Sequence, residues 1–369
     1  MDLRTRRAAG AGLMPAVVVS AWVGAGNLGD ELLLRRLLER LRAAGADEIT
    51  VVSLDPDATR RQHDVPAIDA RAIHRVAGAI RRADLVVAGP GGLLQDHSSP
   101  FNLPYQLHRS VIGRAVRTPV LGMGLGADPM RRRGSGALLR LGLGASVAVA
   151  VRDEPSRVAL ATHRVEATTT ADLALATPSP EPATPSDTVV VSLRPWRPGG
   201  RVPVRWQRHR LVDAQIEATA AALDEIAATQ SLAVRFVAFE PDTDHPLHEA
   251  IAARLHARSE CVVPTLDGLI DTVADSQAVV ATRYHAGIVG LVADRPIAAI
   301  GYAPKVQTLA ADLDGALPIV SDDADGLDRL PAAVASARGG DPALRRAGLA
   351  GLRSREAANA ALIERALAG

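Results

Sequence analysis

Four basic side chains in the second half of the sequence each follow a short apolar run. They are Arg194, Arg283, His285 and Lys305. Binding pockets of parallel-sheet proteins gather at such positions, beyond the carboxyl ends of the strands. A guanidinium group binds a carboxylate or phosphate through two parallel hydrogen bonds, whereas an ammonium group acts as a point charge. The combination favours binding of a small polyanion.

Lys305 is the single lysine of the chain, and every other residue among its 42 Lys and Arg residues is an arginine. One reading is that the turn 301–306 needs a compact ammonium group. The alternative is that the lysine is a chance remnant in an arginine-rich composition. Arg283 and His285 have structural alternatives too, because a strand-end arginine often pairs with an acid and a histidine at a helix start is often structural.

Glycine-rich segments follow apolar runs in the first half, at 24–31, 89–96 and 122–128. Glycine lets backbone amides come close to an anion or a glycan, and a helix N-terminus adds partial positive charge. We expect all three segments to be loops on one edge of one sheet. Gln95 and Asp96 are candidates to hold sugar hydroxyls, with capping of the next segment as the alternative.

Short apolar runs alternate with helical patterns throughout the chain, which predicts βαβ units and parallel sheets. The expected strands of the first half are 17–23, 49–54, 84–89, 119–124 and 146–151. Those of the second half are 188–193, 233–239, 260–263, 278–282 and 296–301. The fold class is therefore α/β, with two successive α/β halves.

A proline-rich segment divides these two sets of strands. Residues 177–187 contain four prolines, which cannot continue a helix or a central strand, so we expect a linker there. The predicted domains are 1–176 and 188–341. Helices are expected over 342–369, packing back on the first domain.

Composition excludes several classes of protein. The 42 basic and 41 acidic residues leave a net charge of +1, so no bulk field favours nucleic acid. A single cysteine, Cys261, rules out an internal disulfide framework and a cysteine-rich metal site, and we expect it in a buried strand. The scattered histidines predict no metal site.

The N-terminal segment and the stretch 194–210 each allow more than one interpretation. The arginines and small residues before Val23 superficially resemble a signal peptide, but they run into a glycine turn and a helix, as a first strand should. No apolar run is long enough to span a bilayer, so we expect a cytoplasmic protein. The stretch 194–210, with Trp196, Trp206 and His209, is either a basic flap over an anionic acceptor or a solvated loop.

Eight motifs, in this order, resemble those of the polysaccharide pyruvyl transferase family. They are Gly26-Asn-Leu-Gly-Asp-Glu31, Gly91-Gly-Leu-Leu-Gln-Asp96, Arg152-Asp153 with Ser156, Ala171-Asp-Leu-Ala-Leu175, Ser192-Leu-Arg-Pro-Trp196, Phe239-Glu-Pro with Asp244, Arg283-Tyr-His-Ala286 and Tyr302-Ala-Pro-Lys305. The resemblance spans nearly the whole chain.

The resemblance implies two Rossmann-type domains facing across a cleft, as in the GT-B glycosyltransferases. It implies transfer of pyruvate from phosphoenolpyruvate to two hydroxyls of one sugar, with a cyclic ketal and phosphate as products and no further cofactor. His285, Arg283 and Lys305 are then the catalytic candidates, and Arg194 joins them in binding phosphoenolpyruvate. The implied acceptor site takes in Asn27, Gly29, Asp30, Gly91, Gly92, Gln95 and Asp96.

The implied partners are phosphoenolpyruvate and a glycan or lipid-linked saccharide of the cell wall or exopolysaccharide, which leaves open a place at the inner face of the membrane. Two other functions remain open. A nucleotide-sugar glycosyltransferase uses the same fold, and fold does not fix function. A catalytically inactive glycan-binding relative is the other, since Pro90, Tyr284 and Ala303 depart from the family pattern.

Overall fold

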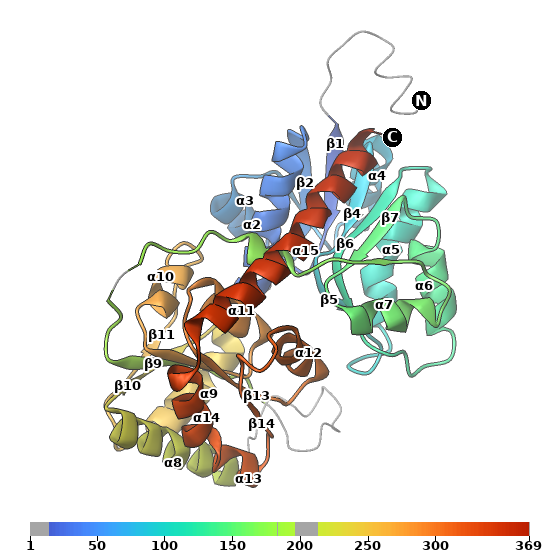
Figure 1. The fold of residues 1–369 in the computed structure, drawn as a ribbon. Coiled ribbons are helices and arrows are strands. Elements are labelled where there is room, and N and C mark those ends of the chain that lie inside the picture. Colours follow the sequence, from blue (N-terminus) through green and yellow to red (C-terminus); the bar gives the residue numbers. More distant parts are fainter. Residues whose placement is uncertain (1–14, 183, 196–212, 369) are drawn as a thin grey trace. The chain divides into compact units, whose positions relative to one another are not determined.

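The computed structural model describes residues 15–182, 184–195 and 213–368 (Figure 1). The chain divides into two compact units. Unit 1 comprises Met1–Ala25, Asp30–Ala176 and Arg353–Gly369, and unit 2 comprises Gly26–Gly29 and Thr177–Leu352. The chain therefore enters unit 2 briefly near its start, returns to unit 1, and crosses again at Ala176.

Unit 1 contains one parallel sheet. Its strands are β1 (Ala16–Ser20), β2 (Glu48–Ser53), β3 (Ala67–Asp69), β4 (Leu85–Ala88), β5 (Gly91–Leu94), β6 (Val120–Ala127), β7 (Ala148–Val151) and β8 (Thr168–Thr169). Their order is β3-β2-β1-β4-β6-β7-β8, and β5 pairs with β6. This is the order of a Rossmann-type sheet, in which the chain changes direction between β1 and β4.

Helices flank this sheet on both sides in the connections between strands. They are α2 (Leu28–Ala43), α3 (Pro56–His63), α4 (Ile73–Arg82), α5 (Asn102–Ala115), α6 (Ser135–Leu143), α7 (Glu154–Ala161) and the short 3₁₀ helix η1 (Leu173–Ala176). In α2, Asp30 and Glu31 lie in the first turn and Arg40 and Arg42 in the last. These charges complement the helix dipole.

Unit 2 repeats the same topology. Its strands are β9 (Thr188–Ser192), β10 (Ala233–Val237), β11 (Ser259–Val262), β12 (Ala278–Ala281), β13 (Ile297–Ile300) and β14 (Ile319–Val320). They are parallel and ordered β11-β10-β9-β12-β13-β14. The switch point of this sheet therefore lies between β9 and β12.

The helices of unit 2 lie on both faces of its sheet. They are α8 (Asp213–Gln230), α9 (Pro241–Ala252), α10 (Leu269–Ala274), α11 (Tyr284–Val292), α12 (Pro304–Asp312), α13 (Ala324–Leu327), α14 (Leu330–Gly339) and the first part of α15 (Pro342–Ala368). Leu223 of α8, Ile251 of α9 and Val334 of α14 are buried in one core with Val191 and Phe236 of the sheet.

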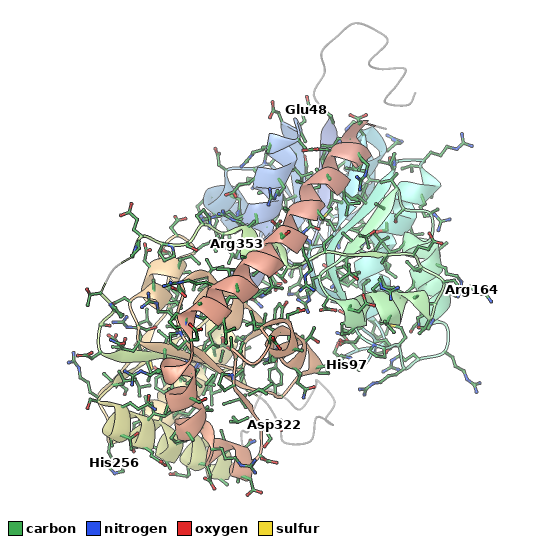
Figure 2. All side chains as sticks on the ribbon, viewed as in Figure 1. Glu48, His97, Arg164, His256, Asp322 and Arg353 are labelled. Atoms are coloured by element: carbon green, nitrogen blue, oxygen red, sulfur yellow. The ribbon has the colours of Figure 1, made fainter. Side chains whose placement is uncertain are left out.

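One long helix ends the chain. The sequence predicted a helix or a pair over 342–369, and the structure has the single helix α15, drawn in red in Figure 1. Its second part belongs to unit 1, where Arg353, labelled in Figure 2, donates from Nε to the Leu175 carbonyl at 3.0 Å. Asn359 donates in the same way to the Ala171 carbonyl at 3.2 Å.

Three local expectations were wrong. Residues Gly91–Leu94 form the strand β5 within the segment expected to be a loop, and β6 continues through Gly122 to Ala127. Glycine occupies every second position, 122, 124 and 126, of this part of β6. Gly124 has a φ of 61°, and a side chain on Gly126 would lie 2.9 Å from the Arg152 guanidinium. Cys261 lies in a strand as expected, but β11 is an edge strand and the thiol is only half-buried.

Candidate active site

Arg194 and Arg283 follow the two strands that flank the switch point of unit 2. Ala281 of β12 is the register partner of Ser192 of β9, so both arginines stand two residues beyond paired positions. The Arg194 amide donates to Thr282 Oγ1 at 2.9 Å, which ties the two strand ends together. Ligands of such sheets bind in the crevice at this point.

Arg283 lies in a buried network of acids. Its Nε donates to Asp244 Oδ2 at 3.0 Å, and its Nη2 donates to Glu240 Oε2 at 2.7 Å, to Thr243 Oγ1 at 3.0 Å and to Asp244 Oδ1. Asp244 is completely buried. Burial lowers the pKa of Arg283, but the charges of Asp244 and Glu240 outweigh it, so the net shift of this pKa is upward.

This network agrees with the structural alternative for Arg283, pairing with an acid, at the Nε and Nη2 edge of its guanidinium group. Within the described residues, the contacts of Arg283 use Nε and Nη2, so an incoming anion would meet the guanidinium through Nη1. The sequence interpretation assigned no role to Asp244 or Glu240, which here bind the guanidinium of Arg283. Their signal was the motif Phe239-Glu-Pro with Asp244, which directly follows β10.

Tyr302 brings the cations of unit 2 together. Arg194 donates from Nη1 to the Tyr302 hydroxyl at 3.5 Å, and its guanidinium carbon lies 5.8 Å from the centre of the ring. Burial raises the pKa of the Tyr302 hydroxyl, but the positive charges of Lys305, Arg194 and Arg283 outweigh it and lower this pKa. Arg194 and Tyr302, which follow β9 and β13, are therefore in contact.

His285 lies in the first turn of α11, and its ring lies against Gly29. A methyl group on Gly29 would be 2.2 Å from Nδ1 of His285, so only glycine permits this approach. The loop is held by two contacts: the Leu28 amide donates to the Phe239 carbonyl at 2.7 Å, and Asn27 Oδ1 accepts from the Gly29 amide at 3.0 Å. Asn27 and Gly29, predicted on the acceptor side, thus belong to unit 2 with His285.

His248 supports the end of β9 from inside unit 2. Its Nε2 lies 2.9 Å from the Leu193 carbonyl and its ring stacks on Phe236, with 5.1 Å between centroids. The side chain is fully buried, and burial lowers its pKa to about 4. A neutral histidine therefore fixes the backbone that leads into Arg194.

In unit 1, the predicted residues Asp30, Gly91 and Gly92 lie beyond the switch-point strands β1 and β4. Gly91 has a φ of 121°, and a side chain there would lie 3.5 Å from Asp30 Oδ1. Gly92 is exposed, and a side chain on it would lie 3.5 Å from Nη2 of Arg152. The two glycines therefore open the backbone toward one acidic and one basic group.

Asp96 and Gln95 make structural contacts. Asp96 is 2% exposed, and its carboxylate accepts hydrogen bonds from the Arg131 amide at 2.9 Å, the Arg132 amide at 2.8 Å and Ser135 Oγ at 2.7 Å. Gln95 Oε1 accepts from the Ser98 amide at 3.0 Å. These contacts favour the capping alternative over a role in holding sugar hydroxyls.

The structure also assigns Glu31 a specific role. Its Oε1 accepts from the Gly24 amide at 2.8 Å, and its Oε2 lies 2.8 Å from Nε2 of the buried His63. Beyond favouring the helix dipole, Glu31 therefore fixes the glycine turn that precedes α2. No sequence pattern pointed to His63, because its partner Glu31 lies 32 positions earlier in the chain.

Other classes of site were searched within the described part of the chain. It contains no group of three or more His, Cys, Asp or Glu residues that could hold a metal ion. No helix in it is long and apolar enough to cross a membrane. The stretch 194–210, interpreted as either a basic flap or a solvated loop, lies outside the described residues from Trp196 onward, together with Trp206 and His209.

Two Rossmann-type units and solved structures of similar fold define the class as GT-B-like. UDP-N-acetylglucosamine 2-epimerase from Rickettsia bellii matches with a TM-score of 0.60 and 10% identity over 96% of this chain and 95% of its own. The UDP-N-acetylglucosamine 2-epimerase from Methanocaldococcus jannaschii matches with a TM-score of 0.58 and 11% identity, over 92% of this chain and 99% of its own. A glycosyltransferase from Rickettsia africae matches with a TM-score of 0.55 and 12% identity, over 96% of this chain and 97% of its own.

The sequence model of the family described as polysaccharide pyruvyl transferase matches residues 27–304. The chain belongs to this family, which confirms the resemblance drawn from its motifs. The match includes Arg194, Arg283 and His285. It ends at Pro304, one residue before Lys305. A search of curated proteins found no match to the chain.

Proposed function

We propose that this transferase moves pyruvate from phosphoenolpyruvate to two hydroxyls of one sugar, with release of phosphate. The observation that carries the proposal is that Arg194 and Arg283 follow the two paired strands at the switch point of unit 2, where Arg194 contacts Tyr302, three residues before Lys305. Phosphoenolpyruvate bears a carboxylate and a phosphate on a three-carbon frame, and a compact cluster of cations suits both groups.

The chemistry requires a proton donor to the methylene carbon of phosphoenolpyruvate. Protonation leaves C2 electrophilic, and one sugar hydroxyl adds to C2 and loses its proton. A second hydroxyl of the same sugar then displaces phosphate from C2 and closes the cyclic ketal. One phosphoenolpyruvate and one diol thus give one ketal and one phosphate, and the reaction needs no cofactor beyond the donor.

His285 is the candidate acid for the first step. It lies in the first turn of α11, two residues after Arg283, so it follows the same strand end as that arginine. Arg194 and Lys305 would hold the phosphate and stabilise the departing oxygens, while Arg283 contributes its charge from the network with Asp244.

The acceptor we propose is a cell-wall or exopolysaccharide glycan, free or lipid-linked, used on the cytoplasmic side of the membrane. Asp30, Gly91 and Gly92 are the candidates to meet it in unit 1. A close backbone approach at the glycines and a carboxylate at Asp30 suit sugar hydroxyls, which donate and accept hydrogen bonds.

The donor is tested first, by titration calorimetry with phosphoenolpyruvate and with a panel of nucleotide sugars. We expect the protein to bind phosphoenolpyruvate and none of the nucleotide sugars. Phosphate release is then measured against free and lipid-linked glycans, with wild type and His285→Ala. Tighter binding of a nucleotide sugar would favour a glycosyltransferase. Near wild-type turnover of His285→Ala at saturating phosphoenolpyruvate would overturn the assignment of the acid.

A further inference from the structure

A cationic pocket lies at the opposite edge of the unit 2 sheet from the candidate active site. It has a volume of about 460 Å³ and is lined by residues that directly precede β12 and β13, by the end of α14 and by the start of α15. Because the strands are parallel, their amino ends form this edge, and the residues discussed above all follow carboxyl ends. The pocket is therefore separate from the cluster around Tyr302.

Four arginines line this pocket against a single carboxylate. They are Arg295, Arg338, Arg345 and Arg346, and the carboxylate belongs to Asp294. Asp294 is shared: its Oδ1 accepts from Arg345 Nε at 3.0 Å and its Oδ2 from Arg346 Nε at 2.9 Å. One negative charge thus serves two guanidinium groups, and the lining carries an excess of positive charge.

The other two arginines bind neutral oxygens. Arg295 donates to the Ala293 carbonyl at 3.0 Å and to the Ser276 carbonyl at 3.4 Å, and Arg338 donates to Gln230 Oε1 at 3.0 Å. These contacts hold the guanidinium groups in place without neutralising them. Burial lowers the pKa of Arg295, the nearby Asp294 raises it, and the positive charge of Arg345 lowers it again, with a net downward shift. Like charges kept this close at a partly buried place favour an anion between them.

We propose that this pocket is a second anion site of the protein, which binds a small ligand bearing at least two phosphate charges, with inorganic pyrophosphate as the simplest example. Guanidinium groups from α14, α15 and the turn before β13 surround the space, and guanidinium forks match phosphate oxygens in pairs. The volume suits a small phosphorylated molecule rather than a polymer. The site does not depend on the function proposed above.

Gly339 provides a test that removes no existing contact. This residue lines the pocket at the end of α14, and a side chain on it would meet no atom within 4 Å. Gly339→Glu therefore places a carboxylate at the mouth of the pocket, and Gly339→Gln places a neutral side chain of the same size there. The difference between the two variants reports charge alone.

Pyrophosphate binding is measured by titration calorimetry at constant ionic strength. We expect wild type and Gly339→Gln to bind alike, and Gly339→Glu to bind about tenfold more weakly or worse. The double variant Arg295→Gln with Arg338→Gln should lose at least as much. Arg258→Gln, an exposed arginine of unit 2 outside the pocket, should bind as wild type does.

Lys305→Met separates this pocket from the candidate active site. We expect pyrophosphate to bind this variant still, since the pocket is intact. Loss of binding in Lys305→Met with retention in Gly339→Glu would place the anion at the other edge of the sheet and overturn the proposal. Absence of binding to wild type, or equal binding by all variants, would also overturn it. Circular dichroism of each variant checks that the fold is retained.

Discussion

Gly29 and His285 are 256 positions apart in the sequence, yet a methyl group on Gly29 would lie only 2.2 Å from Nδ1 of His285. The imidazole thus rests on a backbone surface that has no side chain. Because Leu28 and Asn27 hold the backbone there, the ring is the part that must yield to any larger residue. The position of the candidate acid therefore depends on a glycine of a distant loop.

Gly29→Ala should displace the His285 ring. Displacement of a catalytic group by about 1 Å costs on the order of a hundredfold in rate. We expect turnover to fall by about this factor while phosphoenolpyruvate affinity changes far less, as measured by phosphate release and calorimetry. Gly351→Ala is the control, because a side chain there meets nothing within 4 Å. Equal turnover of the two variants would contradict a role of Gly29 in placing His285.

Replacement of Lys305 tests whether its compact ammonium group matters. Lys305→Arg keeps the charge but adds the bulk of a guanidinium fork, and we expect kcat/KM for phosphoenolpyruvate to fall about tenfold. Lys305→Met removes the charge and should cost about a hundredfold. A normal kcat/KM of Lys305→Arg would mean that the single lysine is a remnant of composition.

Lys305→Met should also raise the pKa of Tyr302. The positive charge of Lys305 favours the phenolate, so its removal shifts ionisation of the hydroxyl to higher pH. The absorbance of tyrosinate during alkaline titration reports this change in a chain with three tyrosines, and Tyr302→Phe identifies the contribution. An unchanged titration would show that Lys305 does not act on Tyr302.

Breaking the pair of Arg283 and Asp244 should destabilise unit 2 strongly. Asp244→Ala leaves a buried guanidinium with too little compensating charge, which costs about 3 kcal/mol or more. Glu217→Ala breaks the exposed pair with Arg254 and should cost less than about 1 kcal/mol. Urea unfolding measures both changes, and similar losses would show that the buried pair has no special structural role.

His248 should make stability depend on pH. Its pKa is about 4 in the folded chain against a usual 6.5, so the unfolded chain takes up a proton first as the pH falls. The contribution of neutral His248 to the free energy of unfolding is fully present above pH 6.5. This contribution should fall by about 3 kcal/mol as the pH drops to 4. Urea unfolding at several pH values should show a smaller slope for His248→Gln. An equal slope would assign the acid sensitivity to other groups.

Variants of Asp96 and Asp30 distinguish a structural carboxylate, that of Asp96, from a candidate contact to the acceptor glycan, that of Asp30. Asp96→Ala removes the partner of two amides and a hydroxyl and should cost about 2 kcal/mol or more in stability. Asp30→Ala should leave stability closer to wild type but raise KM for the acceptor glycan. The assignment would be reversed if Asp96→Ala were stable and raised KM instead.

Local patterns were sufficient for most of the fold. Runs such as Thr188–Ser192 and Ala278–Ala281 are short, apolar and rich in valine, and each was expected within one or two residues of its bounds. The strands β3, β8 and β14 were missed because each has only two or three residues. Glycines misled the interpretation of β5 and β6, since glycine usually marks a turn and here Gly91 and Gly124 take positive φ angles within strands.

The sequence by itself determined the family, the α/β class and the fact that Arg194, Arg283, His285 and Lys305 follow strands of one sheet. Parallel connections place such positions on one edge, so spacing along the chain was enough. Tertiary structure decided which partners these side chains have. The pairing of Arg283 with Asp244, the burial of Asp96 and the approach of Gly29 to His285 all arise from packing between distant segments. No local pattern encodes the outcome of that packing.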